Sequence, residues 1–211
     1  IRRVHGPHSG GAYGIWLDWE AQGTRVTGNA ISDTEWSCLY LEVNHGPILV
    51  DNNVFMGGGI HQRSEGCVFV HNLFYNCPID YSTHDDRQTP YYKPHTMEVA
   101  GKKSIDARDD TWLNNLFIGK GLDTMPEAPG YKADFNAYLG GARKGRYDQH
   151  SFVDAANPQF SRRDNASNTE IALTLPAALF DLDCPLVTHD LVGKVPLVGQ
   201  GIELPDGKPL A

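Results

Sequence analysis

The sequence predicts an all-β fold, a right-handed parallel β-helix, from a repeated pattern, its spacing and the lack of helical periodicity between repeats. In the pattern, an apolar residue is followed by two variable residues, Asn, one further residue and a second apolar residue. Clear copies lie in residues 25–31, 49–55, 68–74 and 111–117, and a weaker copy lies in residues 133–138. The steps between Asn29, Asn53, Asn72, Asn115 and Asn136 are 24, 19, 43 and 21 residues. Three steps match one solenoid coil, and the step of 43 fits one coil with a long insertion or two coils.

The recurring asparagine has a mechanical reason to occupy the same point of each coil. At a bend between strands Asn can adopt left-handed backbone geometry, and its amide can bond to the neighbouring coil. We therefore expect the five asparagines to form a ladder along the solenoid. The alternative, that Asn only marks turns in an all-β protein, leaves the apolar residues three before and two after it unexplained.

The chain divides into two regions in this interpretation. Residues 1–150 form the coils and carry the candidate site, whereas residues 151–211 contain six prolines between short apolar runs. We expect this second region to make strands and loops that pack on the β-helix or cap it. The chain begins at Ile1 within a strand pattern, so we also expect a β-helix truncated at its N-terminus. Further coils, a cap or another domain would precede it.

Composition limits the classes of function. The formal charge of −8 and the scattered Lys and Arg residues argue against a nucleic-acid partner. No apolar run approaches the roughly 20 residues that cross a bilayer, so no membrane partner is expected. An uncharged oligosaccharide fits better as a partner, and a homo-oligomer of the full-length parent stays open. We expect four reduced, buried cysteines because no CxxC motif occurs, and no spacing predicts a metal site or another cofactor.

Two acidic residues lie on segments that alternate as strands do, residues 14–19 and 38–44. The apolar members of each segment must face the core. The outward members are then Trp16 and Asp18 in the first segment and Tyr40, Glu42 and Asn44 in the second. Aromatic rings beside carboxylates suit the C–H faces of sugars, so Trp16 and Asn44 are candidate substrate contacts.

The coil register aligns the two carboxylates. Asp18 lies 11 residues before Asn29 and Glu42 lies 11 residues before Asn53, so both occupy the same position on successive coils. Neighbouring strands lie about 4.7–4.9 Å apart, near the separation of about 5–5.5 Å between the carboxyl groups of a retaining glycosidase. Two like charges this close should keep one carboxyl protonated at higher pH than an isolated one. The alternative is a pair of solvated surface charges.

Four stretches of the sequence resemble the core of glycoside hydrolase family 120, whose founding activity is β-xylosidase. They are residues 14–19 (GIWLDW), 22–26 (QGTRV), 41–47 (LEVNHGP) and 50–53 (VDNN), and the resemblance is dense over residues 8–120. It implies a right-handed parallel β-helix interrupted by a β-sandwich domain, acting with retention at the non-reducing end of xylo-oligosaccharides. It also implies that Asp18 is the nucleophile and Glu42 the general acid/base.

Several neighbouring residues are further candidates for substrate binding. His5 and His8 lie in a Gly-rich loop before the strand of Asp18, and His45 is either an orienting partner of Glu42 or a turn residue. His61 lies 11 residues before Asn72, so we expect it in the column of Glu42, or else as an exposed coil residue. Residues 83–96 are polar and should form a loop over the cleft, from which Arg87 and His95 contact the substrate.

Other functions compete with a retaining β-xylosidase. A glycosidase of the same fold could instead cleave α-L-arabinofuranosides or α-L-fucosides. A polysaccharide lyase needs cations to neutralise a uronate and a Lys or Arg base, whereas this face offers paired acids. A non-catalytic carbohydrate-binding solenoid would function without either carboxylate.

Overall fold

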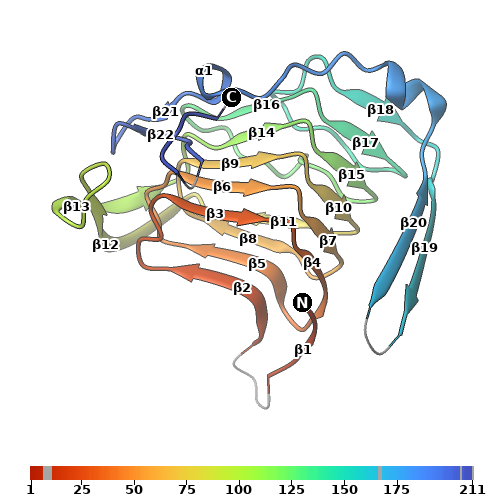
Figure 1. Ribbon diagram of the computed structural model, residues 1–211, viewed down its shortest axis with the longest axis horizontal. Helices are drawn as coiled ribbons and strands as arrows, with labels where there is room; N and C mark the ends of the chain where they lie inside the picture. The colour runs from red at the N-terminus through yellow and green to blue at the C-terminus, as the bar shows by residue number, and fades with distance from the viewer. Residues whose placement is uncertain (7–10, 166–167, 205, 211) are drawn as a thin grey trace.

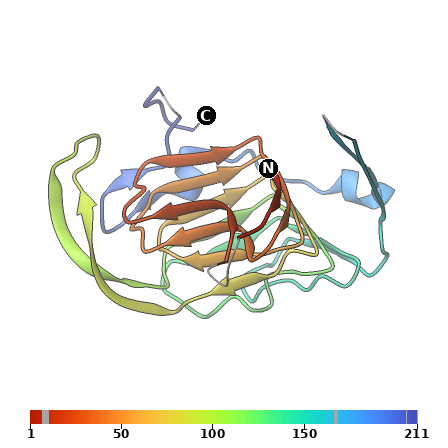
Figure 2. The same ribbon diagram turned by 90° about the horizontal axis from the view of Figure 1, so that it is seen from below.

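The chain winds into stacked coils. A computed structural model describes residues 1–6, 11–165, 168–204 and 206–210. Successive coils add strands to three parallel sheets that run along the solenoid (Figures 1 and 2). The predicted fold class, an all-β parallel β-helix with C-terminal strands and loops packed on it, is confirmed.

The three sheets are named here by their strands. The first contains β2 (Tyr13–Asp18), β5 (Ser37–Glu42), β8 (Ile60–Arg63) and β11 (Ile79–Tyr81). The second contains β3 (Thr24–Thr27), β6 (Ile48–Asp51), β9 (Cys67–Val70), β14 (Thr111–Leu113) and β16 (Lys132–Asp134). The third contains β1 (Arg2–Val4), β4 (Ala30–Thr34), β7 (Val54–Met56), β10 (Leu73–Tyr75), β15 (Leu116–Ile118), β17 (Ala137–Leu139) and β18 (Phe152–Asp154).

Aromatic side chains of the repeat stack inside the coils. The apolar residue two positions after the repeated Asn is Phe55, Phe74, Phe117 or Tyr138 in successive coils, and all four are fully buried. Their neighbouring ring centroids lie 5.3, 4.8 and 5.1 Å apart. Because burying one such side chain contributes about 1.5–3 kcal/mol, this column stabilises the stacking of the coils.

The repeated asparagines form the expected ladder. The side-chain Nδ2 of Asn29 donates to Oδ1 of Asn53 at 3.0 Å, and the same bond of 3.0 Å joins Asn53 to Asn72, Asn72 to Asn115 and Asn115 to Asn136. From Asn53 onward, each Oδ1 in this asparagine ladder also accepts the backbone N–H of the preceding ladder residue. Buried amide groups are therefore satisfied from one coil to the next.

The expected backbone geometry of the ladder was wrong by one residue. The left-handed conformation belongs to the residue before each ladder asparagine, namely Gly28, Asn52, His71, Asn114 and Phe135, with φ between 54° and 69°. The bend from the second sheet to the third needs one such residue in each coil. Placing it one position earlier leaves the ladder asparagine free to direct its amide into the stack.

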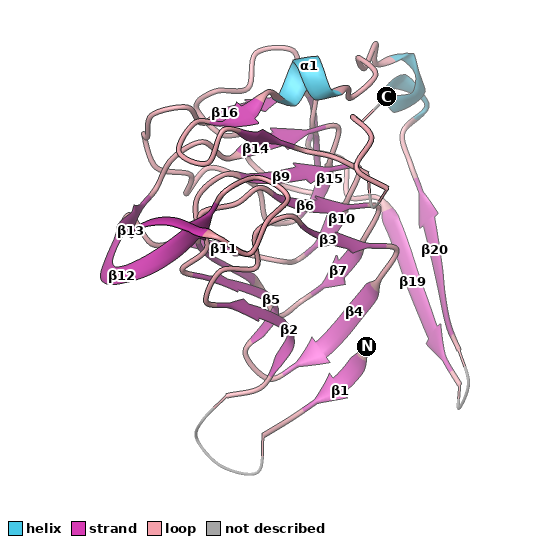
Figure 3. Cartoon of the chain, turned by 60° about the vertical axis from the view of Figure 1, so that its left-hand side comes forward, coloured by secondary structure: helices cyan, strands magenta, loops and turns pink. Residues whose placement is uncertain are grey.

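The long step in the repeat is one coil with an insertion. Strand β10 pairs directly with β15, with Leu73 opposite Leu116, so no additional coil separates Asn72 from Asn115. The insertion is an antiparallel hairpin of β12 (His84–Tyr92) and β13 (Val99–Asp106), where a loop was expected. It lies on the opposite side of the coils from the β19–β20 hairpin (Figure 3). Its strands carry too few apolar residues to have been predicted as strands.

The C-terminal region packs along the coils. Strand β18 still pairs with β17, and it is followed by the antiparallel hairpin of β19 (Gln159–Asp164) and β20 (Thr169–Thr174). Next come the 3₁₀-helix η1 (Ala177–Asp181), the short helix α1 (His189–Val192), β21 (Lys194–Val195) and β22 (Gln200–Gly201). Val187, Val192 and Ile202 of this region pack on Leu49, Val68, Val70 and Leu113 of the second sheet.

Three of the four cysteines behave as expected. Cys38, Cys67 and Cys77 are free and buried, whereas Cys184 is free and exposed, so the expectation of burial was wrong for this residue. Cys184 follows η1 in the C-terminal region, outside the coil pattern that buries the other three. Among the described residues, no helix is long and apolar enough to span a membrane.

An acidic side chain is enclosed in the interior. Asp110 has no exposed surface and accepts hydrogen bonds from Gln62 Nε2 at 2.7 Å and from the backbone N–H of Cys67 at 2.9 Å. Burial raises the pKa of Asp110 from 3.8 to about 8, because the charged form is poorly solvated there. The folded chain therefore favours the protonated acid over a wide range of pH.

Replacing an interior ladder residue should destabilise the whole solenoid. In Asn72→Ala, the Asn53 amide loses its acceptor and the Val50 carbonyl loses its donor, both in a buried setting. We expect the free energy of unfolding to fall by about 3 kcal/mol, measured by denaturant titration, since each unsatisfied buried group costs about 1–3 kcal/mol. The exposed Asn157→Ala variant is the control, and an equal loss there would refute the special role of the ladder.

Asp110 should make stability depend on pH. Its pKa is raised in the folded chain, so the folded state binds more protons than the unfolded state between about pH 4 and pH 8. The free energy of unfolding should therefore be highest at the acid end of this window and fall as pH rises, by at most about 1.4 kcal/mol per unit. Asp110→Asn should flatten this slope in denaturant titrations, whereas the exposed Glu127→Gln should not.

Candidate active site

Asp18 and Glu42 lie side by side on the first sheet. Strands β2 and β5 pair in parallel with Asp18 directly opposite Glu42, both at the C-terminal ends of their strands. Asp18 is exposed, whereas Glu42 retains 8% of its accessible surface. The distance between paired strands, about 4.8 Å, thus separates the two backbones.

Two donors occupy the oxygens of Glu42. The indole Nε1 of Trp16 donates to Oε2 at 2.9 Å, and Nη2 of Arg87 donates to Oε1 at 2.8 Å. Arg87 belongs to β12, so the inserted hairpin reaches back over the first sheet to this carboxylate. Asp85 in turn binds the Arg87 guanidinium through Nε at 2.9 Å and Nη2 at 2.8 Å. Asp85, Arg87 and Glu42 thus form a continuous series of ion pairs that links the hairpin to the first sheet.

An aromatic surface borders the carboxylates. Trp16 stacks on Tyr40 with centroids 5.5 Å apart, and Tyr13 contacts both rings at 5.3 and 4.9 Å. Trp36 extends the group, with its ring 5.6 Å from that of Tyr13. Trp16 is 52% exposed and Trp36 is 45% exposed, so the surface is open to solvent beside a pair of acids. Such surfaces suit the apolar faces of sugar rings.

Sequence reasoning missed Tyr13 and Trp36. Strict alternation assigns Tyr13 to the core side together with Ile15, but Gly14 itself faces the core, since a Cβ there would clash with Ile31. On the next strand, Cys38 and Leu39 are likewise both buried. The glycine in an otherwise regular strand was the available signal of this irregularity.

Burial and a neighbouring carboxylate both act on Asp18. The pKa of Asp18 is raised, first by burial and then by the charge of Glu42. The pKa of the Tyr40 hydroxyl is raised as well, by burial and by its hydrogen bond to Glu42. Both shifts follow from the crowding of polar groups around one partly buried carboxyl.

Two predicted substrate contacts lie inside the fold. Asn44 and His45 have no exposed surface, so the expectation that they contact a sugar was wrong. The residue before them, Val43, has a φ of 52°, which breaks the strand alternation and turns Asn44 inward. There the Asn44 side chain donates to the Leu17 carbonyl at 3.0 Å.

His45 instead connects a coil to the inserted hairpin. Its Nδ1 lies 2.8 Å from Glu65 Oε1, and its Nε2 lies 2.9 Å from the hydroxyl of Thr89 on β12. The carboxylate of Glu65 and the nearby Glu20 raise the pKa of His45, against the opposing effect of burial. His45 therefore attaches the hairpin to the coil by hydrogen bonds and does not contact the Asp18–Glu42 pair directly.

His61 does not continue the column of Glu42. It pairs with Tyr40, and Arg63 takes the position opposite Glu42. The corner from the first sheet to the second spans six residue steps from Glu42 to Ile48 but four from Arg63 to Cys67, which pairs with Ile48. The shorter corner shifts the register by two, so counting back from the ladder misplaced His61.

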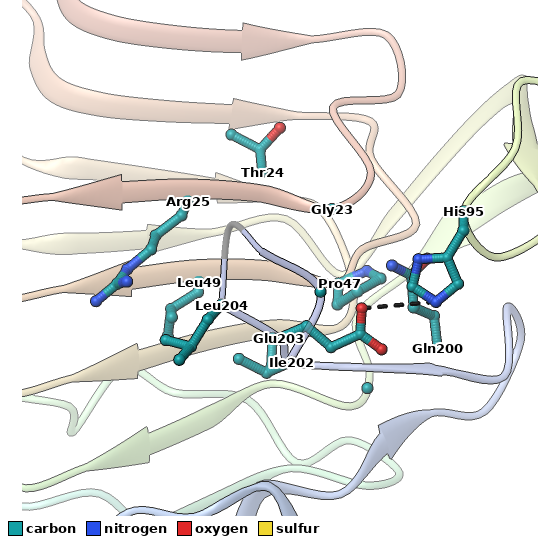
Figure 4. Close-up of a pocket in the computed structure, with 12 residues that line it drawn as sticks. Gly23, Thr24, Arg25, Pro47, Leu49, His95, Gln200, Ile202, Glu203 and Leu204 are labelled. Carbon is teal, nitrogen blue, oxygen red and sulfur yellow. Dashed lines mark ion pairs between the residues drawn. The ribbon is translucent and has the colours of Figure 1, made fainter. Parts of the chain in front are cut away.

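The remaining histidine candidates lie elsewhere or outside the described residues. His5 is exposed just after β1, on the third sheet, and His8 lies outside the residues that the structure describes. His95 lies near the tip of the inserted hairpin, with its Nε2 3.6 Å from Glu203 Oε2. It borders a cavity of about 410 Å³ between Gly23, Pro47 and the C-terminal segment (Figure 4). Neither Asp18 nor Glu42 lines this cavity.

Among the described residues, no group of three or more His, Cys, Asp or Glu side chains is arranged to hold a metal ion. The first sheet offers a pair of neighbouring carboxyl groups and an open aromatic surface, and the hairpin adds the Arg87 guanidinium. This combination is suited to acid–base or nucleophilic chemistry on a neutral, hydroxylated ligand.

Comparison with known proteins finds a similar solved structure. No protein-family model matches the chain, and no curated protein does. A solved structure, that of XylC in complex with xylose, matches with a TM-score of 0.84 and 28% sequence identity over 94% of this chain. The chain spans 36% of the XylC chain. The resemblance predicted from the sequence is thus confirmed: the chain is a parallel β-helix like that of glycoside hydrolase family 120.

Proposed function

We propose that this chain carries the catalytic pair of a retaining, exo-acting β-xylosidase that cleaves xylo-oligosaccharides. The observation that carries the proposal is the in-register pairing of Asp18 with Glu42 on one open face of the β-helix. The likeness to XylC, solved with xylose, supports a xylose-containing substrate. The chain spans about a third of XylC, so the activity of the whole protein is part of the proposal.

The proposed reaction has two steps. First, the Asp18 carboxylate attacks the anomeric carbon, the glycosidic C–O bond breaks, and the leaving oxygen takes a proton from Glu42. Second, the Glu42 carboxylate removes a proton from water, which attacks the anomeric carbon and releases Asp18. The sugar is displaced twice at one carbon, so its configuration is retained. The division of roles follows the family resemblance, and the spacing of the pair fits it.

The surroundings of the pair support binding of a sugar. Trp16, which is exposed and stacks on the buried ring of Tyr40, presents an aromatic face beside Glu42 on which the C–H face of a pyranose can rest. The inserted hairpin lies beyond the C-terminal ends of the first-sheet strands, and Arg87 from it contacts Glu42 (Figure 1). One side of the pair is thereby bordered by the hairpin, whereas the aromatic side is open. A binding surface bordered on one side is consistent with action at a chain end.

Rescue by azide should assign the two carboxylates. With dinitrophenyl β-xyloside, Glu42→Gly should still form the glycosyl-enzyme, and azide should convert it to β-xylosyl azide. In Asp18→Gly, azide should displace the leaving group directly and give α-xylosyl azide. Without azide, Glu42→Gly should lower kcat/KM for unactivated xylosides by about 10²–10⁴-fold, the usual contribution of general acid–base catalysis. Product configuration is read by NMR.

The same assay tests the alternatives. A panel of nitrophenyl glycosides should show the highest kcat/KM for the β-xyloside, and a higher value for an α-L-arabinofuranoside or α-L-fucoside would change the proposed substrate. An ultraviolet-absorbing unsaturated product would indicate a lyase. The exposed Glu127→Gln variant is the matched control and should keep full activity. Full activity in Asp18→Gly and Glu42→Gly would contradict the proposal.

A further inference from the structure

We infer that Arg87, supplied by the β12–β13 hairpin, is a positioning residue that holds Glu42 in its ionised form between catalytic events. This inference rests on the proposed function, because it assigns a role to Arg87 through Glu42. It replaces the expectation that Arg87 simply contacts the substrate. The argument depends on how Arg87 is fixed, how the hairpin is seated and which other charges face Glu42.

Arg87 is held in one orientation by Asp85. The Asp85 carboxylate accepts from the Arg87 backbone N–H at 3.0 Å, from Nε at 2.9 Å and from Nη2 at 2.8 Å. The same Nη2 reaches Glu42 Oε1 at 2.8 Å. A guanidinium fixed by such a fork loses little further freedom when it binds a second carboxylate. Asp85 thus prepares Arg87 for Glu42.

Contacts at Thr89 and Tyr92 attach β12, which carries Arg87, to the coils. Thr89, two residues further along β12, bonds to His45. Near the end of β12, Gln22 pairs with Tyr92 as a strand residue would: its Nε2 donates to the Tyr92 carbonyl at 3.0 Å, and its Oε1 accepts the Tyr92 N–H at 2.9 Å. These contacts fix the β12 backbone beside the site. The Arg87 contact is therefore built into the fold.

Other charged groups near Glu42 are engaged elsewhere or have the same sign as Glu42. The titratable and charged groups that face it are Tyr13 and Asp18 on β2, Tyr40 on β5, His61 and Arg63 on β8, and Asp85 and Arg87 on β12. Arg63 directs its Nη2 to Asp80 at 2.8 Å. Among the described residues, Arg87 is thus the cation that bonds to the Glu42 carboxylate.

This arrangement favours one half of the proposed cycle over the other. In the second step Glu42 acts as a base, and a bound guanidinium stabilises the carboxylate that the first step leaves behind. In the first step Glu42 must carry a proton, which Arg87 opposes. Arg87 therefore narrows the pH range in which the acid is protonated, and its separation from Glu42 on substrate binding would release the acid.

The test is the pH profile of kcat/KM for an unactivated xyloside. Arg87→Met should move the alkaline limb upward by about one pH unit, since an opposite charge at this distance favours the ionised acid by about that much. Arg87→Lys keeps the charge and should keep the limb near its original position. Asp85→Asn removes the negative charge that shares the Arg87 guanidinium, so more positive charge faces Glu42 and the limb should move downward, opposite to Arg87→Met. Arg146→Met, at a remote exposed pair, is the control.

The outcomes separate this inference from the proposed function. An unchanged alkaline limb in folded Arg87→Met and Asp85→Asn, with hydrolysis intact, would overturn the role of Arg87 alone. A shift of the acid limb instead would make Glu42 the group that must be ionised, and would overturn the inference together with the assignment of roles. An unchanged protein that hydrolyses no glycoside would overturn the proposed function itself. Circular dichroism and thermal unfolding establish that each variant is folded.

Discussion

The asparagine ladder is the constraint on which the site depends. Each ladder amide bonds to its neighbours on adjacent coils, so the coils can stack in one register only, and slipping by one residue would orphan a series of buried donors and acceptors. The aromatic column beside it fills the interior at the same level. Because the first two coils have corners of equal length, this register brings Asp18 opposite Glu42. The ladder thus determines the relative position of Asp18 and Glu42, although it contacts neither side chain.

Sequence periodicity predicted this frame well because the frame is repetitive. Asn29 and Asn53 supply the same signal one coil apart, and equal offsets back to Asp18 and Glu42 place both carboxylates without knowledge of the corner between the sheets. The method failed where a coil departs from its neighbour. Counting back from Asn72 selected His61, although the shortened corner puts Arg63 opposite Glu42. Local backbone geometry was equally invisible in the pattern, as with Val43, whose positive φ turns Asn44 inward.

The contribution of the hairpin could not have come from the repeat. Residues 84–106 pair with each other and interrupt the coil, so their position relative to the first sheet follows from tertiary contacts made by Gln22 and His45. Neither of these contacts was predicted: His45 was expected to orient Glu42 or to form a turn, and Gln22 was noted only within a stretch that resembles the family. Arg87 was identified as a candidate from its place in a polar insertion, but its contact with Glu42 and its support by Asp85 required the structure. In a site built from a repeat and an insertion, the sequence therefore predicts the residues that the repeat positions but not the contacts of the insertion.

The corner between the first and second sheets has a further consequence. It loses two residues between the second coil and the third, yet strands β6 and β9 remain paired and the ladder continues from Asn53 to Asn72. The change in length is taken up within the corner itself, because β5 and β8 stay paired with Arg63 opposite Glu42. Insertions or deletions confined to this corner would therefore leave both the interior and the strand beside the carboxylate pair in place. The corner is thus a point where the chain can vary in length at little structural cost to the site.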